Sequence, residues 1–414
     1  MAKGRALIHL KLAILSLLRN KRRTAVSLFN LAITLTLVLM FEGFAESMFD
    51  GLRESMIRSQ LGHAQIFASG FNQYGALSDV KLLLTEQTKQ LVIDRVSSIP
   101  GVVAVAPRLE TDALLANGAA QMSVHVTGID SDREAVISSA VQVREGSELL
   151  PENQDGIMVG QALAEALGIK PGDELTLLGT SVNQTVNAVD VVVCGIITTG
   201  VLERDLRTVF ANNALMERFL LSRGASRIVL LLDRTDRTGA VMDMLKTRLA
   251  GIQQPLELRS WEQLATYYHQ VVTLFGSIFL FVKVILLAVG GLAISNALSM
   301  SVVERTREIG VVRAIGGGRM QISVLFLLEG AVLGCVGGGA GVLASLGAAR
   351  LVHYSGLMMP TPPGSTITYP MRILLSDAML METFLTCVGV ALLASLLPAI
   401  RAAHMNIVEA LGHA

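Results

Sequence analysis

The sequence predicts an α-helical membrane domain with four transmembrane helices and a large α+β domain inserted between the first and second spans. Three observations predict this fold class. Four stretches stay apolar over the roughly 20 residues that a helix needs to cross a hydrocarbon core about 30 Å thick. The segment 46–270 instead contains short stretches of alternating hydrophobicity separated by turn-forming residues. Hydrophobic residues make up 51% of the 414 residues, and 38 glycines accompany one tryptophan, which suits closely packed membrane helices.

The expected elements follow one another as a helical arm, four spans and the segments between them. Their boundaries are 1–23 for a cytoplasmic amphipathic helix, 24–45 for the first span, 46–270 for a periplasmic domain, 271–300 for the second span, 301–320 for a cytoplasmic segment, 321–352 for the third span, 353–377 for a periplasmic loop, 378–400 for the fourth span and 401–414 for a cytoplasmic tail. Basic residues dominate before the first span and in 301–320. The positive-inside rule therefore places both termini in the cytoplasm and the inserted domain outside.

The N-terminal segment is expected to form an amphipathic helix on the inner leaflet. Its polar residues share one arc of a 3.6-residue helix, with the cations facing lipid phosphates. These residues are Arg5, His9, Ser16, Arg19, Asn20 and Arg23. A simple basic flank is the alternative. A cleavable signal peptide would need a shorter apolar core and a small-residue cleavage site, whereas this run ends in FEGFAESMF, so an uncleaved anchor is predicted.

The inserted domain contains a weak internal repeat. One unit runs from strand 63–68 through helix 86–98 to strand 102–109, and a second from strand 227–232 through helix 237–250 to strand 255–259. We therefore expect two β-α-β lobes that flank a β-rich insert at about 115–200.

The motifs of nucleotide and metal sites are not found in the sequence. No stretch has the spacing G-x-x-x-x-G-K-[ST] that surrounds phosphates, and GAGVLA at 339–344 lies inside a predicted span with no strand before it. Cys194, Cys335 and Cys387 lie too far apart for a disulfide framework or a zinc spacing. The formal net charge of zero does not favour a nucleic-acid partner. We expect no catalytic residues, no metal and no cofactor in this chain.

Polar and small residues inside the spans indicate helix contacts. Gly330, Gly334 and Gly338 repeat the G-x-x-x-G spacing, with Gly341 alongside, and such faces let another helix backbone approach closely.

Two charged residues in the spans are expected to pair. Glu42 in the first span and Lys283 in the second lie at matching depths, so we predict an ion pair between them in at least one state. The alternative is that each reaches the outer headgroups separately. Glu329, barely two turns into the third span, is expected at the cytoplasmic interface.

The segment between the second and third spans carries the sequence ERTREIGVVRAIGGG. On a short helix, Val303, Ile309, Val312 and Ile315 can supply an apolar side. A solvated turn needs polarity but not this mixed pattern, whereas a protein-docking helix needs both.

These residues resemble a known family. The run NALSMSVVERTREIGVVRAIGGGRMQISVLFLLEGAVLGCVGG resembles the MacB- and FtsX-like permeases of ABC transporters. The segments LRNKRRT, PAIRAAHMNIVEAL and GIMVGQALAEALGIKPGDELTLLG resemble the opening, the closing and the extracytoplasmic parts of that family. The length and the lack of a fused ATPase also resemble the lipoprotein-releasing permeases LolC and LolE, although their GRRRGG-type opening is absent.

The resemblance implies a dimer with a second copy or a related permease, two cytoplasmic ABC ATPase subunits that bind ATP and Mg, and contact with membrane lipids. It also leaves room for a periplasmic or outer-membrane partner. ATP-driven motion would pass through the membrane helices to the external domain, which is called mechanotransmission. By the same resemblance, the residues that contact the ATPase are Glu304, Arg305, Arg307, Glu308 and Arg313.

The expected function is therefore that of a permease subunit, not an enzyme, which uses a partner's ATP hydrolysis to export or extract a lipoprotein, a lipid or a periplasmic substrate. An FtsX-like signalling protein that activates a cell-wall hydrolase without transport is the alternative.

Overall fold

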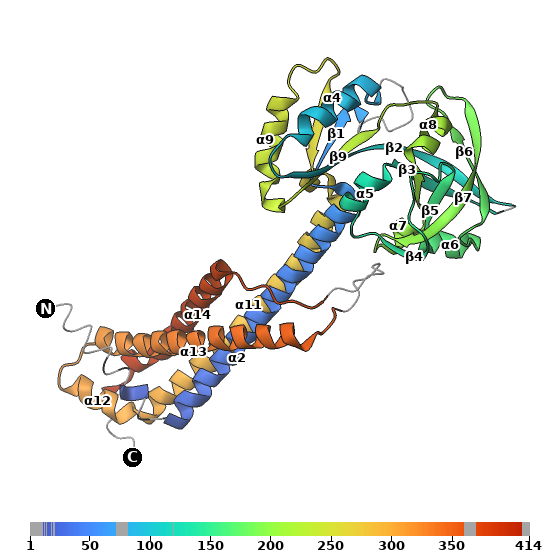
Figure 1. Ribbon diagram of the computed structural model, residues 1–414. Coiled ribbons are helices and arrows are strands. Elements are labelled where there is room, and N and C mark those ends of the chain that lie inside the picture. The colour runs from blue at the N-terminus through green and yellow to red at the C-terminus, as the bar shows by residue number, and fades with distance from the viewer. Residues whose placement is uncertain are drawn as a thin grey trace. The chain divides into compact units, whose positions relative to one another are not determined.

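The computed structural model describes residues 11, 13, 15–17, 19, 21–71, 82–118, 120–359 and 370–407 (Figure 1). The chain divides into two compact units. The helical unit comprises Met1–Asp50, Val271–Met358 and Pro370–Ala414, and the α/β unit comprises Gly51–Gln270 and Met359–Tyr369. The predicted N-terminal positions Arg5, His9 and Asn20 lie outside the described residues.

Among the described residues, four helices are long and apolar enough to cross a membrane by length and composition. They are α2 (Lys21–Met56), α11 (Thr266–Glu304), α13 (Arg319–Ser355) and α14 (Asp377–His404). Each contains one predicted span, and the fold class is confirmed. The helices begin earlier and end later than the predicted spans, because hydropathy marks the lipid-facing part of a helix. A helix itself continues until a breaker or cap stops it.

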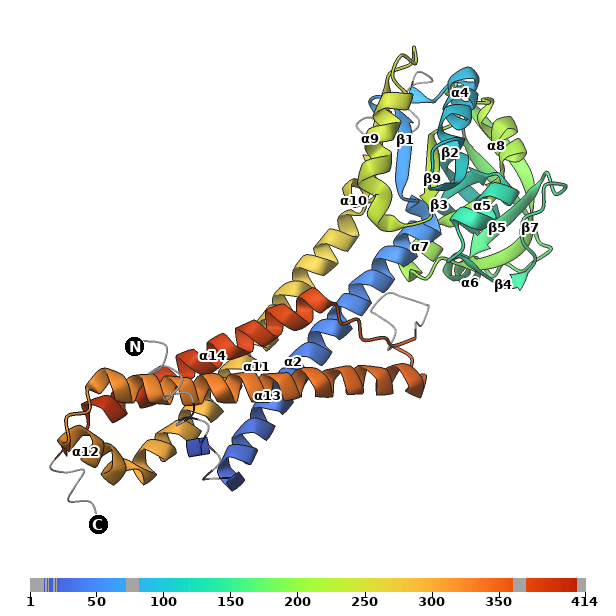
Figure 2. The same ribbon diagram turned by 60° about the vertical axis from the view of Figure 1, so that its left-hand side comes forward.

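The helical unit has a shared apolar core. Figures 1 and 2 both show α2 and α11 running side by side, and Leu35 of α2, Ile294 of α11, Leu333 of α13 and Ala391 of α14 are buried in one cluster. Large apolar side chains also lie on the outside, as in Leu292, which is 70% exposed. Exposed side chains of this kind suit a helix surrounded by lipid or by another subunit.

The glycines of α13 lie on two helix contacts. A Cβ at Gly334 would lie 2.8 Å from the Cβ of Ala391 on α14, and a Cβ at Gly341 would lie 2.8 Å from the Cβ of Leu35 on α2. Gly330 and Gly338 also face α14. The predicted small-residue repeat therefore serves close approach of α13 to two neighbouring helices.

The described residues of the α/β unit form ten strands. Their bounds are β1 (Ala64–Ala68), β2 (Val102–Asn117), β3 (Ala120–Ile129), β4 (Gln142–Gly146), β5 (Gly156–Gly160), β6 (Glu174–Thr180), β7 (Val186–Thr198), β8 (Thr208–Asn212), β9 (Arg227–Leu232) and β10 (Leu256–Ser260). The helices between and after them are α4 (Glu86–Ser97), α5 (Ser131–Ile137), α6 (Gln161–Leu167), α7 (Leu202–Asp205), α8 (Asn213–Leu220), α9 (Thr238–Arg248) and α10 (Trp261–Leu264).

The two predicted β-α-β lobes are not separate. Their strands interleave in the order β10-β1-β9-β2, with every neighbouring pair antiparallel. α4 and α9 share one hydrophobic cluster on this sheet, through Val92 and Val96 of α4 and Leu245 of α9. The prediction of two lobes was wrong because a repeat in the sequence does not say whether each unit completes its own sheet. This interleaving of two β-α-β units is the split β-α-β arrangement.

The β-rich insert is larger than predicted. Strands pair in the ring β2-β3-β8-β5-β7-β6-β2, so the sheet closes on itself around a core that includes Val126, Val159 and Val209. The insert therefore extends past 200 to include β8 and α8, whose Phe219 is buried in the same core. Closure leaves fewer free strand edges in this part of the unit.

Candidate functional site

The segment between α11 and α13 forms the short helix α12 (Thr306–Ala314). It is set off from α11 by Arg305, whose backbone is non-helical at φ −107° and ψ 16°. It ends before Gly316, whose φ of +100° favours glycine. Ile309 is buried with Phe326 of α13 and Ala399 of α14, so one face of α12 packs against the helical unit.

The other face of α12 combines apolar and charged side chains. Val311 is 46% exposed, Val312 is 41% exposed and Ile315, just after the helix, is 81% exposed. Arg307 is exposed as well, and no ion pair joins it to another described residue. The predicted apolar side of this segment is thus divided, since Ile309 belongs to the core while Val312 and Ile315 face outward.

Arg305 points into the protein. Its Nη1 donates to Glu329 Oε1 at 2.7 Å and to Ser16 Oγ at 2.6 Å, and its Nε donates to Glu308 Oε2 at 3.1 Å. Its guanidinium lies 5.8 Å from the ring centroid of Phe326, a cation–π distance. The Arg305 side chain is only 15% exposed and that of Glu329 only 1%. Arg305 therefore faces α13 and the N-terminal arm more than the solvent.

The N-terminal arm, meaning the described residues from 11 to 23, forms ion pairs with both glutamates of this segment. Arg19 Nη1 lies 2.8 Å from Glu308 Oε1, and Arg23 Nη1 lies 2.7 Å from Glu304 Oε2. The hydrogen bond from Arg19 holds the pKa of Glu308 below its ordinary value, so that this carboxylate stays ionised. The orientation of these cations toward lipid phosphates stays a prediction, and the structure adds that Arg19 and Arg23 each have a carboxylate of this segment within hydrogen-bonding distance.

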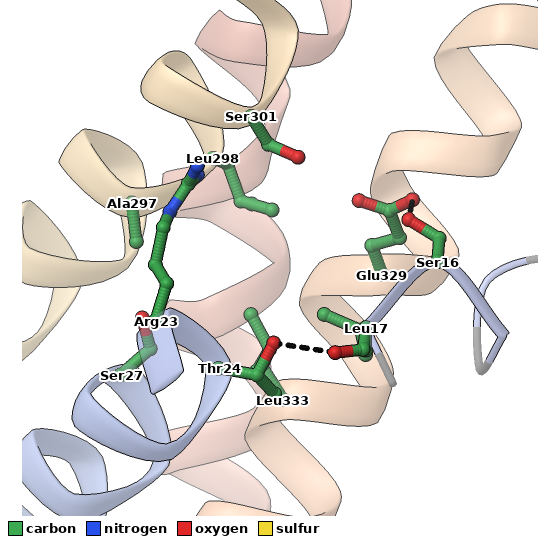
Figure 3. A pocket seen from close by; sticks show the side chains of 10 residues that line it. All are labelled: Ser16, Leu17, Arg23, Thr24, Ser27, Ala297, Leu298, Ser301, Glu329 and Leu333. Carbon is green, nitrogen blue, oxygen red and sulfur yellow. Dashed lines mark hydrogen bonds between the residues drawn. The ribbon is translucent and has the colours of Figure 1, made fainter. Parts of the chain in front are cut away.

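Glu329 lies at the edge of a small pocket (Figure 3). The pocket encloses about 20 Å³ and is lined by Ser16, Thr24, Ser301 and Glu329, among others. Ser16 donates to Glu329 Oε1 at 2.6 Å, while Oε2 is buried and has no hydrogen-bond partner among the described residues. The position of Glu329 at the cytoplasmic interface stays a prediction, and the structure adds that Ser16 of the arm and Arg305 beside α12 cover its carboxylate.

The remaining predicted contact residue, Arg313, binds the other end of the chain. Its Nη1 donates to the carbonyl oxygen of Met405, just after α14. Of the five predicted contact residues, Arg307 alone is exposed without an ion pair to another described residue, whereas Glu304, Arg305, Glu308 and Arg313 are held by the chain itself.

Sequence reasoning did not anticipate the role of the N-terminal arm. The signal was present, because Arg19 and Arg23 are spaced by four residues, as are Glu304 and Glu308. Two basic residues at i and i+4 can therefore form two ion pairs with two acidic residues at i and i+4 when the two segments lie side by side. The buried partner of Arg305 was also signalled, since an acidic residue inside an apolar span needs a partner.

The predicted intramembrane ion pair is present. Lys283 Nζ of α11 lies 2.5 Å from Glu42 Oε1 of α2, and both side chains are largely covered. Thr383 of α14, which the sequence did not indicate, donates to Glu42 Oε2 at 2.7 Å. The carboxylate of Glu42 therefore connects three helices.

Two family models match this chain. The model described as FtsX-like permease C-terminal matches residues 278–407, and the model described as MacB-like periplasmic core domain matches residues 24–248.

Several known proteins are similar to it. The lipoprotein-releasing system transmembrane protein LolC of Neisseria meningitidis serogroup B is 26% identical over 328 residues, which cover 75% of this chain and 78% of LolC. The macrolide export ATP-binding/permease protein MacB of Psychrobacter cryohalolentis is 22% identical over 98% of this chain, which spans 60% of that protein.

Among solved structures, the periplasmic region of MacB from Actinobacillus actinomycetemcomitans is similar at 12% identity and a TM-score of 0.36, with 52% of this chain and 94% of that chain covered.

Proposed function

Because this chain belongs to the MacB- and FtsX-like family of ABC transporter permeases, we propose that it is the membrane subunit of a transporter of the mechanotransmission type. A separate cytoplasmic ATPase would bind ATP and Mg, and this chain would relay its motion to the inserted domain. A second permease, either another copy or a related chain, would complete the assembly.

One observation carries the proposal. α12 is a short helix between two spans that presents exposed apolar side chains beside the exposed Arg307. Exposed apolar residues next to charge favour a protein partner rather than solvent or lipid alone. The excess of Arg and Lys before α2 and around α12 supports a cytoplasmic position for this surface.

The long helices support a mechanical relay. α2 is 36 residues long and α11 is 39, which is about 54 and 58 Å at 1.5 Å per residue. A helix keeps its backbone hydrogen bonds within itself, so such a rod carries a displacement along its length.

We propose a lipoprotein, a lipid or a substrate already outside the membrane as the cargo. The large inserted domain favours transport over signalling. The name of one relative refers to lipoprotein release and that of another to macrolide export.

Co-purification from native membranes tests this function. We expect an ABC ATPase and a permease subunit to accompany the chain, together with retained lipid or lipoprotein. A stable complex with a cell-wall hydrolase, combined with ATP hydrolysis that no cargo stimulates, would replace transport by signalling.

A charge reversal tests the proposed ATPase contact. Arg307→Glu should reduce co-purified ATPase activity at least about tenfold, because a like charge at a protein contact costs more than about 1.4 kcal/mol. The amount of chain inserted in the membrane should not change. Arg144→Glu, an exposed reversal on β4, serves as the matched control. Equal activity of both variants would exclude Arg307 from the contact.

A further inference from the structure

An ion-pair chain, which we define as Arg19, Glu308, Arg305 and Glu329, runs from the surface into the helical unit. Its charges alternate in sign, and its contacts measure 2.8 Å, 3.1 Å and 2.7 Å in that order. Exposure falls along it, from 54% for the Arg19 side chain and 51% for Glu308 to 15% for Arg305 and 1% for Glu329. The buried end is the most costly to separate, because the carboxylate of Glu329 would remain buried without its ionic partner.

Arg305 occupies the break between two helices. α11 ends at Glu304 and α12 begins at Thr306, so Arg305 belongs to neither helix. Arg305 is the N-cap of α12, and its carbonyl oxygen accepts from the backbone N–H of Ile309 at 3.0 Å, so its backbone moves with α12. Its side chain binds Glu329 of α13, and Phe326 of α13 lies beside the same guanidinium.

The backbone between α12 and α13 is a poor mechanical link. It contains Gly316, Gly317 and Gly318 in succession. Consecutive glycines have the widest conformational freedom, so a displacement of α12 would be absorbed there. Side-chain contacts that bypass the glycines would carry motion of α12 to α13 directly, and the ion pair of Arg305 with Glu329 is one of them, beside the packing of Ile309 against Phe326.

We propose that Arg305 is a positioning residue that transmits displacement of α12 to α13 through Glu329, rather than a contact for the ATPase. The inference rests on the proposed function, because the displacement comes from an ATPase bound to α12. The N-terminal arm adds hydrogen bonds to this connection. Arg19 donates to Glu308, and Ser16 donates to the same oxygen of Glu329 that accepts from Arg305.

The test measures the distance between α11 and α13 in the complex of this chain with its co-purified ATPase in lipid nanodiscs. Spin labels at Leu280 of α11 and Leu351 of α13, which are 61% and 73% exposed, report the distance with and without ADP and vanadate. In the chain that carries only the spin labels, trapping of the ATPase with ADP and vanadate should shift the distribution of distances between α11 and α13. Arg305→Ala and Glu329→Gln should abolish this shift while ATP hydrolysis stays within twofold.

Control variants separate transmission from general damage. Glu329→Asp keeps the negative charge and should retain the shift. Arg319→Ala removes a positive charge at the start of α13 and should retain it as well, because Arg319 lies outside the ion-pair chain. Arg305→Lys keeps a cation and should retain part of the shift. It tests the role of residue 305 if Arg305→Ala is not monodisperse.

The outcomes distinguish the two proposals. A full shift in well-folded Arg305→Ala and Glu329→Gln overturns the role of Arg305 and leaves the permease function standing. If the complex with the unchanged chain hydrolyses ATP but the α11–α13 distance does not shift, the role of Arg305 is also overturned and the permease function still stands. If no ATPase accompanies the chain, the proposed function fails, and the inference fails with it.

Discussion

His63 lies fully buried beside β9, and its hydrogen bonds define its protonation. The backbone N–H of Leu232 donates to Nδ1 at 3.0 Å, so Nδ1 must be unprotonated and Nε2 carries the hydrogen toward Thr235 Oγ1, 3.0 Å away. Thr235 in turn donates to Glu54 Oε1 at 2.7 Å. Burial lowers the pKa of His63 to about 4, against the opposing effect of Glu54.

This neutral histidine predicts a loss of stability in acid. Between pH 6.5 and about 4 the unfolded chain binds a proton at this position and the folded chain does not, so the free energy of unfolding falls as the pH falls. We expect a loss of up to about 3 kcal/mol between pH 7 and pH 4. Trp261, the one tryptophan of the chain, is buried near this site and reports urea unfolding by fluorescence.

His63→Asn is the control for this prediction. Its side-chain oxygen can accept the Leu232 hydrogen bond but does not titrate. The pH dependence of unfolding should be weaker in His63→Asn than in the unchanged chain, and equal slopes would assign the acid sensitivity to other groups.

The ion pair between Glu42 and Lys283 is expected to stabilise the helical unit. Among the described residues, Lys283→Met leaves the covered carboxylate of Glu42 with Thr383 as its one partner, so we expect the helical unit to lose about 1–3 kcal/mol of stability, measured as thermal unfolding in detergent. The double reversal Glu42→Lys with Lys283→Glu should recover most of the loss, because a threonine hydroxyl can accept from lysine as readily as it donates to glutamate. Failure to recover would show that each charge acts alone.

At the level of whole elements, α13 depends on glycine at particular positions. In Gly334→Ala the new Cβ would lie 2.8 Å from the Cβ of Ala391, which cannot rotate away, so the two helices must separate. We expect a loss of about 1–3 kcal/mol, measured by thermal unfolding in detergent. Gly339→Ala is the matched control on the same helix, since nothing lies within 4 Å of its Cβ position.

The control should not merely be neutral. Alanine favours a helix over glycine by about 1 kcal/mol, so Gly339→Ala is expected to stabilise α13 slightly. If both substitutions had the same effect, helix propensity rather than the contact with α14 would explain the glycines.

The element α12 shows how far local sequence reasoning reaches. A mixed polar and apolar stretch between two spans was sufficient to predict a short helix, because the glycines that end it are a local signal. The same pattern could not say that Ile309 packs inward while Ile315 stays 81% exposed, since that depends on where α13 and α14 lie.

For the whole molecule, the proposed orientation can be measured directly. In a chain whose native cysteines are replaced, a single cysteine at Arg307 should react with a membrane-impermeant maleimide only after the inner membrane is opened. A single cysteine at Glu148 of the α/β unit should react in cells whose outer membrane alone is permeable. The opposite pattern would reverse the proposed topology and remove the cytoplasmic ATPase surface.

The strand pairing of the α/β unit lay beyond local reasoning. The repeated strand-helix-strand units were located within a few residues, yet their interleaving as β10-β1-β9-β2 and the closed ring of the insert were not foreseen. Pairing joins residues more than a hundred positions apart, as in Ile66 with Ile228, and alternating hydrophobicity does not identify the partner strand.

Local composition was enough for the four apolar helices, the inserted domain and the small face of α13, and it offered the pairing of Glu42 with Lys283 as one of two alternatives, of which the structure shows the pair. Each of these follows from the free-energy cost of placing polar groups or charges in the membrane, which can be assessed from a short segment or from two residues at the same depth. The partners of Arg305, Glu304 and Glu308 required the tertiary fold. An arginine in a charged stretch suits solvent, another protein or a buried carboxylate equally well, and only the packing of the N-terminal arm and α13 around α12 selects Glu329.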